Sequence, residues 1–239
     1  MAGGSMQQLP LAVGPADYAV FENFLPGPNA ALVHALEELA GVASRAMLWA
    51  WGPAESGRTH LLQATVTAAD AARYRGAYLP LAEASLQPSA LEGLGDFDLV
   101  CLDDVDQVAG DPDWERALFA LFEALRARRA RLVVSALRAP LHAGFQLPDL
   151  ASRWTSGATF RVRALDDEQK QAALQCRAAW RGLDLPDDAA RYLLTHSTRG
   201  TAALFELLDR LDSESLVAQK RLTVPFVRRV LDEKTPQQS

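Results

Sequence analysis

The chain has 239 residues, of which 49% are hydrophobic, and its formal net charge at pH 7 is −6. This length accommodates one sizeable domain plus a smaller one, and the hydrophobic content is that of a globular protein. The acidic balance argues against a general nucleic-acid binder, because such a protein depends on a clustered basic surface.

The cysteines and the apolar stretches bear on the cellular compartment. Cys101 and Cys176 are far apart in the chain, which favours reduced thiols over a disulfide scaffold. The longest apolar stretches have the length of strands, and no basic segment followed by a hydrophobic core opens the sequence. We therefore expect a cytoplasmic protein with neither a transmembrane helix nor a signal peptide.

Residues 1–16 precede every predicted element and contain a short polar-then-apolar peptide. Apolar side chains on a flexible end suggest a peptide that docks on a partner. A frayed terminus, or a strand that packs on the body of the protein, remains an open alternative. The peptide consists of Gln7, Gln8, Leu9, Pro10 and Leu11.

An aromatic segment, Tyr18 to Phe24, comes before the turn Pro26 to Asn29 and a helix predicted from about Ala30 to Ala40. Aromatic residues usually serve a core. Because these three precede the loop described next, they are also candidates to border a nucleotide base.

The apolar run Met47 to Trp51 predicts a buried strand, and a helix is predicted from about Arg58 to Tyr74. Between them two glycines stand five residues apart, followed by a cation and a hydroxyl, which is the layout of a phosphate-binding P-loop. Glycines allow successive amide groups to turn toward an anion, and the helix points its positive end at the same place. The predicted nucleotide-binding residues are Gly52, Pro53, Ala54, Glu55, Ser56, Gly57, Arg58, Thr59 and His60.

Arg58 stands where the P-loop pattern has lysine. Arginine keeps the charge without the compact ammonium group, so phosphate binding can persist while the geometry for hydrolysis changes. Thr59 is the expected Mg²⁺ ligand. A glycine-rich turn with no ligand is the alternative.

From Met47 onward, predicted strands alternate with predicted helices. Further strands are expected at 76–81, 98–102, 131–135 and 159–162, with a helix at about 112–129. This alternation predicts an α/β fold whose parallel sheet has helices on both faces and binds its ligand at the carboxyl ends of the strands. Only helices follow Leu165, at about 166–181, 186–195, 201–211 and 224–231. We expect a nucleotide-binding domain at 17–164 and a small helical lid at 165–239.

Polar residues follow two of these strands. Asp103 and Asp104 end an apolar strand, where carboxylates would meet the phosphates, hold Mg²⁺ through a water and orient an attacking water. Ser135, at the end of the next strand, is placed to sense the outer phosphate. Solvated turn residues are the alternative for the acidic pair.

Two arginines outside the P-loop are further candidates. Arg153, on a short predicted helix before the last strand, is placed to reach a neighbour's γ-phosphate as an arginine finger, with a surface ion pair as the alternative. Arg199, at the start of the third lid helix, is a candidate lid contact to the nucleotide. A solvated position is its alternative.

Together these residues resemble the AAA+ ATPases of bacterial replication initiation, the DnaA group. The resemblance covers nearly the whole chain after residue 17. Its carriers are the aromatic segment Tyr18 to Asn29, the P-loop with Thr59-His60-Leu61-Leu62, the strand Leu99 to Asp104, and Leu150 to Arg153.

Within that group the chain is similar to a regulatory branch. The sequence ends near residue 239, so we expect no helix-turn-helix DNA-binding domain and no direct sequence-specific DNA binding. The Pro148 to Arg153 segment and the ending Leu222 to Val227 match that branch, and Gln7 to Leu11 resembles its peptide for the replicative sliding clamp. Met6 stands where the longer form of that peptide has glutamine.

The resemblance implies a protein that binds ADP or ATP with Mg²⁺ and docks on the DNA polymerase III β sliding clamp. It would offer Arg153 to ATP held by DnaA, and hydrolysis there would prevent re-initiation. The chain would thus activate the DnaA ATPase and have weak or no activity of its own. A homodimer is also allowed for.

Two other readings stay open. One is a self-assembling AAA+ ATPase, such as a helicase loader, that hydrolyses ATP at its own Asp103 and Asp104. The other is a nucleotide-dependent adaptor unconnected with DnaA.

Overall fold

The structure is a computed structural model that describes residues 19–41, 46–196, 200–218 and 221–232. The predicted docking peptide Gln7 to Leu11, Tyr18 and Arg199 lie outside the described residues. The predictions for these positions therefore stay predictions.

A parallel sheet of five strands forms the first part of the chain, in the order β2-β3-β4-β1-β5. The strands are β1 (Met47–Trp51), β2 (Gly76–Pro80), β3 (Leu99–Asp103), β4 (Arg131–Ala136) and β5 (Ala158–Arg161). Every residue of β3 and β4 is buried, as expected for central strands covered on both faces.

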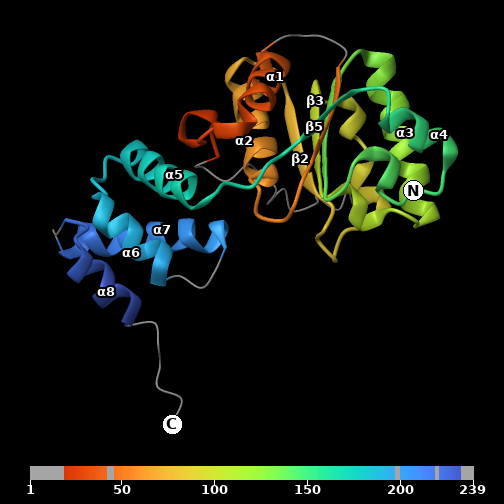
Figure 1. The fold of residues 1–239 in the computed structure, drawn as a ribbon. Helices are drawn as coiled ribbons and strands as arrows, with labels where there is room; N and C mark the ends of the chain where they lie inside the picture. Colours follow the sequence, from red (N-terminus) through yellow and green to blue (C-terminus); the bar gives the residue numbers. More distant parts are fainter. Residues whose placement is uncertain (1–18, 42–45, 197–199, 219–220, 233–239) are drawn as a thin grey trace, which may run out of the picture.

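Helices cover the two faces of this sheet. On one face lie α1 (Ala30–Gly41) and α2 (Arg58–Ala71), and on the other lie α3 (Pro112–Arg128) and α4 (Pro148–Trp154) (Figure 1). Each face has its own hydrophobic core, because side chains alternate along each strand: Leu48 packs with α1 and α2, whereas Trp49 packs with α3 and α4. The predicted α/β fold is confirmed.

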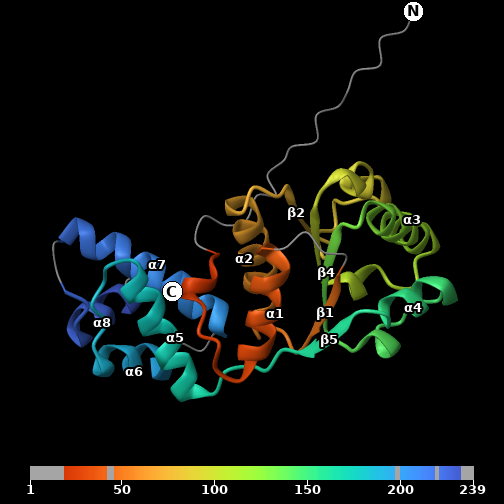
Figure 2. The ribbon, with the colours of Figure 1, turned by 90° about the horizontal axis from the view of Figure 1, so that it is seen from above.

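Only helices follow β5. They are α5 (Asp167–Trp180), α6 (Asp187–His196), α7 (Thr201–Ala218) and α8 (Val224–Asp232). A capping box at Asp166 and Gln169 starts α5, and a separate cluster of buried apolar residues joins all four helices. Figure 2 shows this bundle on the side of the sheet that α1 and α2 occupy.

Two helix ends differ from the predicted ones. The helix α2 ends at Ala71 rather than near Tyr74, because Arg73 adopts a left-handed backbone with φ +65° and the amide of Tyr74 donates back to the carbonyl of Ala69. The helix α7 continues to Ala218 rather than ending near Leu211. No glycine or proline follows Leu211 within the helix to end it. The prediction from hydrophobic spacing alone therefore put the end of the helix too early.

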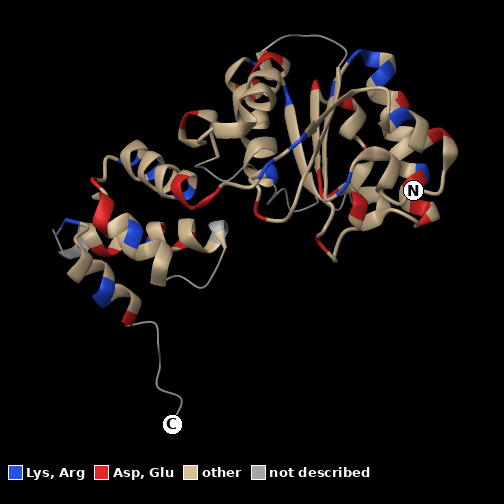
Figure 3. Cartoon of the chain, viewed as in Figure 1, with Lys and Arg blue, Asp and Glu red and all other residues tan. Residues whose placement is uncertain are grey.

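Figure 3 shows the charged residues along the helices. Both α3 and α5 have acidic residues in the first turn and basic residues in the last turn, which suits the helix dipole. Within the described ranges, no helix has the length and apolar character that crossing a membrane requires.

Candidate functional site

The loop between β1 and α2 carries the two glycines of the predicted phosphate site. Gly57 adopts φ +94°, and a Cβ there would lie 2.8 Å from the ring of Phe24. At Gly52 a Cβ would lie 2.3 Å from the carbonyl oxygen of Val162, the residue after β5. Both positions therefore require glycine, the first by conformation and the second by close packing.

Two buried polar atoms in this loop have no hydrogen-bond partner among the described residues: the hydroxyl of Ser56 and Nη1 of Arg58. Ser56 is 4% exposed and Arg58 is 7% exposed. Buried donors left unmatched are costly, so this arrangement fits an anionic ligand that would accept from them. Pro53, Ala54, Glu55 and Thr59 are exposed around them and form the rim of the loop.

Asp103, the last residue of β3, is buried and held from both neighbouring strands. Its carboxylate accepts a hydrogen bond from the Tyr78 hydroxyl on β2 at 2.9 Å and another from the Ser135 hydroxyl on β4. Burial, and then the charge of Asp103, raise the pKa of Tyr78, so this phenol stays protonated and donates. Both carboxylate oxygens of Asp103 thus accept hydrogen bonds.

Asp104 follows with a left-handed backbone, φ +53° and ψ +47°, which aspartate tolerates better than most residues. Its amide donates to the Ser135 hydroxyl at 2.9 Å, and its carboxylate forms an ion pair with Nη2 of Arg58 at 2.9 Å. Burial and the neighbouring Asp103 raise the pKa of Asp104, while Arg58 acts in the opposite direction.

A cavity of about 310 Å³ opens beside the P-loop and extends to the lid. Thr59, His60 and Gln63 line it from α2, and Arg177 and Phe205 line it from the lid. The ring of His60 stacks on Phe24 with centroids 5.4 Å apart, and its Nε2 lies 3.0 Å from the Val20 carbonyl. Burial lowers the pKa of His60, so the ring is neutral in the fold.

The lid presents charged groups to this cavity. Arg177 is 3% exposed, stacks over Phe205 and pairs with Asp209 at 3.7 Å. On the other side of the loop, the Glu55 carboxylate lies against Gly200, where a Cβ would lie 1.5 Å from it. The P-loop and the lid thus meet both at the cavity and at the start of α7.

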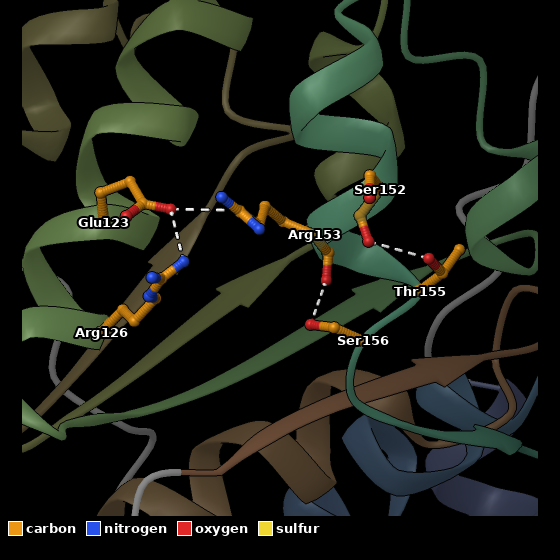
Figure 4. Close-up of polar contacts among 6 residues, drawn as sticks. All are labelled: Glu123, Arg126, Ser152, Arg153, Thr155 and Ser156. Atoms are coloured by element: carbon orange, nitrogen blue, oxygen red, sulfur yellow. Dashed lines mark hydrogen bonds and ion pairs between the residues drawn. The ribbon is translucent and has the colours of Figure 1, made fainter.

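Arg153 lies on the other face of the sheet, near the end of α4 (Figure 4). Its Nε pairs with Oε1 of Glu123 at 3.1 Å, and Arg126 pairs with the same oxygen at 3.4 Å. The side chains of Arg153 and Arg126 are each 39% exposed. Arg153 thus forms the surface ion pair that was the alternative prediction, and its role as an arginine finger stays a prediction.

Two anchors fix the helix that carries Arg153. Leu150 and Trp154 are fully buried on the inner side of α4, and Trp154 packs against Trp49 of β1 with ring centroids 5.6 Å apart. Glu115, itself 2% exposed, accepts the amide of Leu147 at 2.6 Å just before α4 begins. Arg153 therefore projects from a rigid support.

The two arginine sites lie at opposite edges of the sheet. Arg58 follows the carboxyl end of β1, whereas the turn after α4 approaches the start of β1, since a Cβ on Gly157 would lie 2.5 Å from the Met47 carbonyl oxygen. The five residues of β1 separate these edges by about 13–16 Å. Arg153, in the last turn of α4, therefore lies at the opposite edge of the sheet from its own P-loop.

The structure brings together most of the predicted nucleotide site: the P-loop, Asp103, Asp104 and Ser135. Sequence reasoning missed Tyr78, Glu123 and Glu115. The strand position of Tyr78 was visible, but its contact with Asp103 depends on β2 lying next to β3. The two glutamates carry no signal in the sequence that distinguishes them from solvated helix residues.

Comparisons with known proteins agree with this geometry. Residues 167–231 match the family model for the lid domain of Hda. An uncharacterized protein of Haemophilus influenzae is 39% identical over 228 residues, which are 95% of this chain and 99% of the relative.

The fold is similar to several solved structures. Domain III of the replication initiation protein DnaA from Thermotoga maritima superposes with a TM-score of 0.73 at 21% identity, covering 91% of this chain and 97% of that one. AMPPCP-bound DnaA from Aquifex aeolicus gives 0.64 at 19% identity, covering 92% and 70%. The RuvB Holliday junction branch migration motor from Thermotoga maritima gives 0.62 at 16% identity, covering 88% and 69%.

Proposed function

Because this chain belongs to the Hda family of DnaA-related AAA+ replication regulators, we propose that it is a negative regulator of replication initiation. It stimulates hydrolysis of ATP held by DnaA by contributing Arg153 to that partner's site. The nucleotide that turns over is then the partner's, and the chain activates an ATPase rather than acting as one.

The position of Arg153 is the observation that carries this proposal. The guanidinium is half-exposed on a firmly anchored helix, at the edge of the sheet opposite its own P-loop. Exposed ion pairs contribute only about 0–1 kcal/mol, so Arg153 can leave Glu123 for a phosphate at little cost. An arginine that stabilises the charge of a phosphoryl-transfer transition state accelerates the reaction by about three to five decades.

The chain's own P-loop has a supporting role in this proposal: it holds ADP and thereby fixes the body that presents Arg153. Ser56 and Arg58 supply the unmatched buried donors that a diphosphate would satisfy. Thr59, together with Asp103 through a water, would hold Mg²⁺, which supplies positive charge to the phosphates when bound. The AMPPCP-bound DnaA of similar fold supports nucleotide binding at this loop.

Docking on the sliding clamp completes the proposal. It rests on the resemblance of Gln7 to Leu11 to a clamp-binding peptide. The clamp would bring the chain to DNA on which DnaA acts, and Arg153 would then act across the boundary between the two proteins.

The test uses purified DnaA loaded with labelled ATP, DNA-loaded clamp and the full chain. Arg153→Ala is expected to lower the stimulated rate of hydrolysis by about three decades. Arg126→Ala is the matched control, because Arg126 has the same exposure and pairs with the same oxygen of Glu123. We expect it to keep the parent rate within about threefold, since it lies one helix away and outside the proposed transition-state contact.

If Arg153→Ala stimulates hydrolysis as well as the parent chain does, the finger assignment is lost. Equal losses in the two variants would also reject it, because they would point to the general charge of this surface. Deleting residues 7–11 tests clamp docking separately. With this variant, we expect that adding loaded clamp no longer raises the rate of hydrolysis.

A further inference from the structure

Arg58 is the P-loop cation, yet in this structure its charge is already matched inside the chain. Its Nη2 lies 2.9 Å from Oδ1 of Asp104, and the two side chains are only 8% and 27% exposed. An ion pair shielded from water is screened far less than one on the surface. While this ion pair is intact, the positive charge of Arg58 is largely neutralised, and a phosphate gains its full attraction only if Arg58 leaves Asp104.

The backbone of Asp104 is held in place beside the P-loop. Its backbone is held in the left-handed region, and its amide is fixed by the Ser135 hydroxyl at 2.9 Å. Ser135 in turn donates to Asp103, which also accepts from Tyr78. Side chains from β2 and β4 thus hold the end of β3, and from there the Asp104 carboxylate reaches Arg58.

The second guanidinium nitrogen indicates which part of a nucleotide this arrangement accommodates. Nη1 of Arg58 is buried and has no hydrogen-bond partner among the described residues, and the same is true of the Ser56 hydroxyl in the loop. These two groups can donate hydrogen bonds to the anion that the P-loop amides surround. A further phosphoryl group beyond it would compete with the carboxylate of Asp104 for Nη2 of Arg58.

We propose that the Arg58–Asp104 ion pair sets the nucleotide specificity of this chain, favouring a nucleoside diphosphate over a triphosphate. The inference rests on the nucleotide binding in the proposed function and names the residues that select the ligand. A triphosphate brings additional negative charge next to Asp104 and finds Arg58 already neutralised. A diphosphate ends at the loop amides, Ser56 and Nη1 of Arg58, so the ion pair stays intact.

The experiment measures the dissociation constants of Mg·ADP and Mg·ATP for the full chain, freed of any bound nucleotide, by isothermal titration calorimetry. Asp104→Asn removes the carboxylate charge but keeps the size and the tolerance of asparagine for a left-handed backbone. We expect the parent to prefer ADP and the variant to reduce that preference by about tenfold, chiefly through tighter ATP binding.

Asp106→Asn is the matched control. Asp106 lies two residues further on, accepts the amide of Leu137 at 3.1 Å and, among the described residues, forms no ion pair with Arg58. Asp106→Asn removes one negative charge from the same turn but leaves the Arg58–Asp104 ion pair intact. We therefore expect the preference for ADP to stay within about twofold of the parent value. Thermal unfolding of each variant verifies that it is folded.

An unchanged preference in folded Asp104→Asn would overturn the inference, as would an equal change in Asp106→Asn. If the parent binds both nucleotides equally well, the inference fails while nucleotide binding stands. If it binds neither, the nucleotide part of the proposed function fails first. A reduced preference confined to Asp104→Asn would support the ion pair as the selecting element.

Discussion

Two arginines, one at each edge of the sheet, are each paired with a carboxylate. The two ion pairs differ in their exposure to solvent, and this difference distinguishes the two arginines. Arg58 and Asp104 are 8% and 27% exposed, whereas Arg153 and Glu123 are 39% and 37% exposed. The distances, 2.9 and 3.1 Å, hardly differ. Burial rather than pairing therefore shows which arginine is committed to its own chain and which is available to a partner.

The largest effect on stability is expected from breaking the buried pair. Arg58→Ala leaves Asp104 without its partner and should lower the free energy of unfolding by about 3 kcal/mol, the lower end for a buried pair because Asp104 keeps some contact with water. Arg153→Ala should cost less than about 1 kcal/mol. Urea unfolding followed by tryptophan fluorescence compares them directly. Equal costs would contradict the assigned difference in burial.

Two glycines allow each edge to be disturbed separately. Gly52→Ala places a Cβ 2.3 Å from the Val162 carbonyl, and Gly157→Ala places one 2.5 Å from the Met47 carbonyl. Each should destabilise the chain by about 2 kcal/mol through overpacking. We expect Gly52→Ala to weaken ADP binding but keep Arg153 in place, and Gly157→Ala to weaken stimulation of DnaA but keep ADP binding.

The control for both is Gly41→Ala, at the end of α1, where a Cβ would have no heavy atom within 4 Å. This variant should lie within about 1 kcal/mol of the parent, in the stabilising direction. Loss of both functions in either test variant, while the chain remains folded, would mean that the two edges are not separable.

The smallest effect is expected from His60, which belongs to the nucleotide edge. Because burial lowers its pKa in the fold, His60 binds a proton more readily when unfolded. Its contribution to stability is complete above the unfolded pKa of about 6.5 and is lost as the pH falls below that value toward the folded pKa. His60→Gln should make unfolding free energy less dependent on pH between about 7.5 and 5.5.

His34→Gln, which removes a histidine whose side chain is 72% exposed, is the control for this pH series. The control should keep the slope of the parent. A slope that stays the same in His60→Gln would contradict the buried, neutral state of that ring.

Much of the fold was predictable because local patterns determine it. The positions of all five strands followed from apolar runs and glycines in the sequence. Because the carboxyl ends of parallel strands lie at one edge of the sheet, Asp103, Asp104 and Ser135 were expected to lie close together. The contact of Tyr78 with Asp103 was beyond the sequence, because it depends on the order of the strands. The predicted end of α2 was wrong, because only the folded chain shows the left-handed turn at Arg73.

The carboxylates that pair with the two arginines could not be predicted from the sequence either. Arg58 is equally suited to a phosphate and to a carboxylate, and the aim of Asp104 follows from its backbone and from Ser135. Glu123 is one of several charged residues on the surface of α3, and only the packing of α4 against α3 brings it to Arg153. Spacing identifies candidate charges, whereas tertiary packing decides which of them meet.

The central claim is that the bond is cleaved in the partner's site and not in this chain. A single-turnover measurement of phosphate release from labelled ATP on DnaA, with loaded clamp, tests it by comparing Arg153→Ala with Asp104→Asn in the regulatory chain. The account predicts that Arg153→Ala abolishes the stimulated release, and that Asp104→Asn, saturated with ADP, keeps it within about threefold. Release that survives Arg153→Ala but is lost in Asp104→Asn would contradict the account, and would favour a self-assembling ATPase that hydrolyses ATP in its own site.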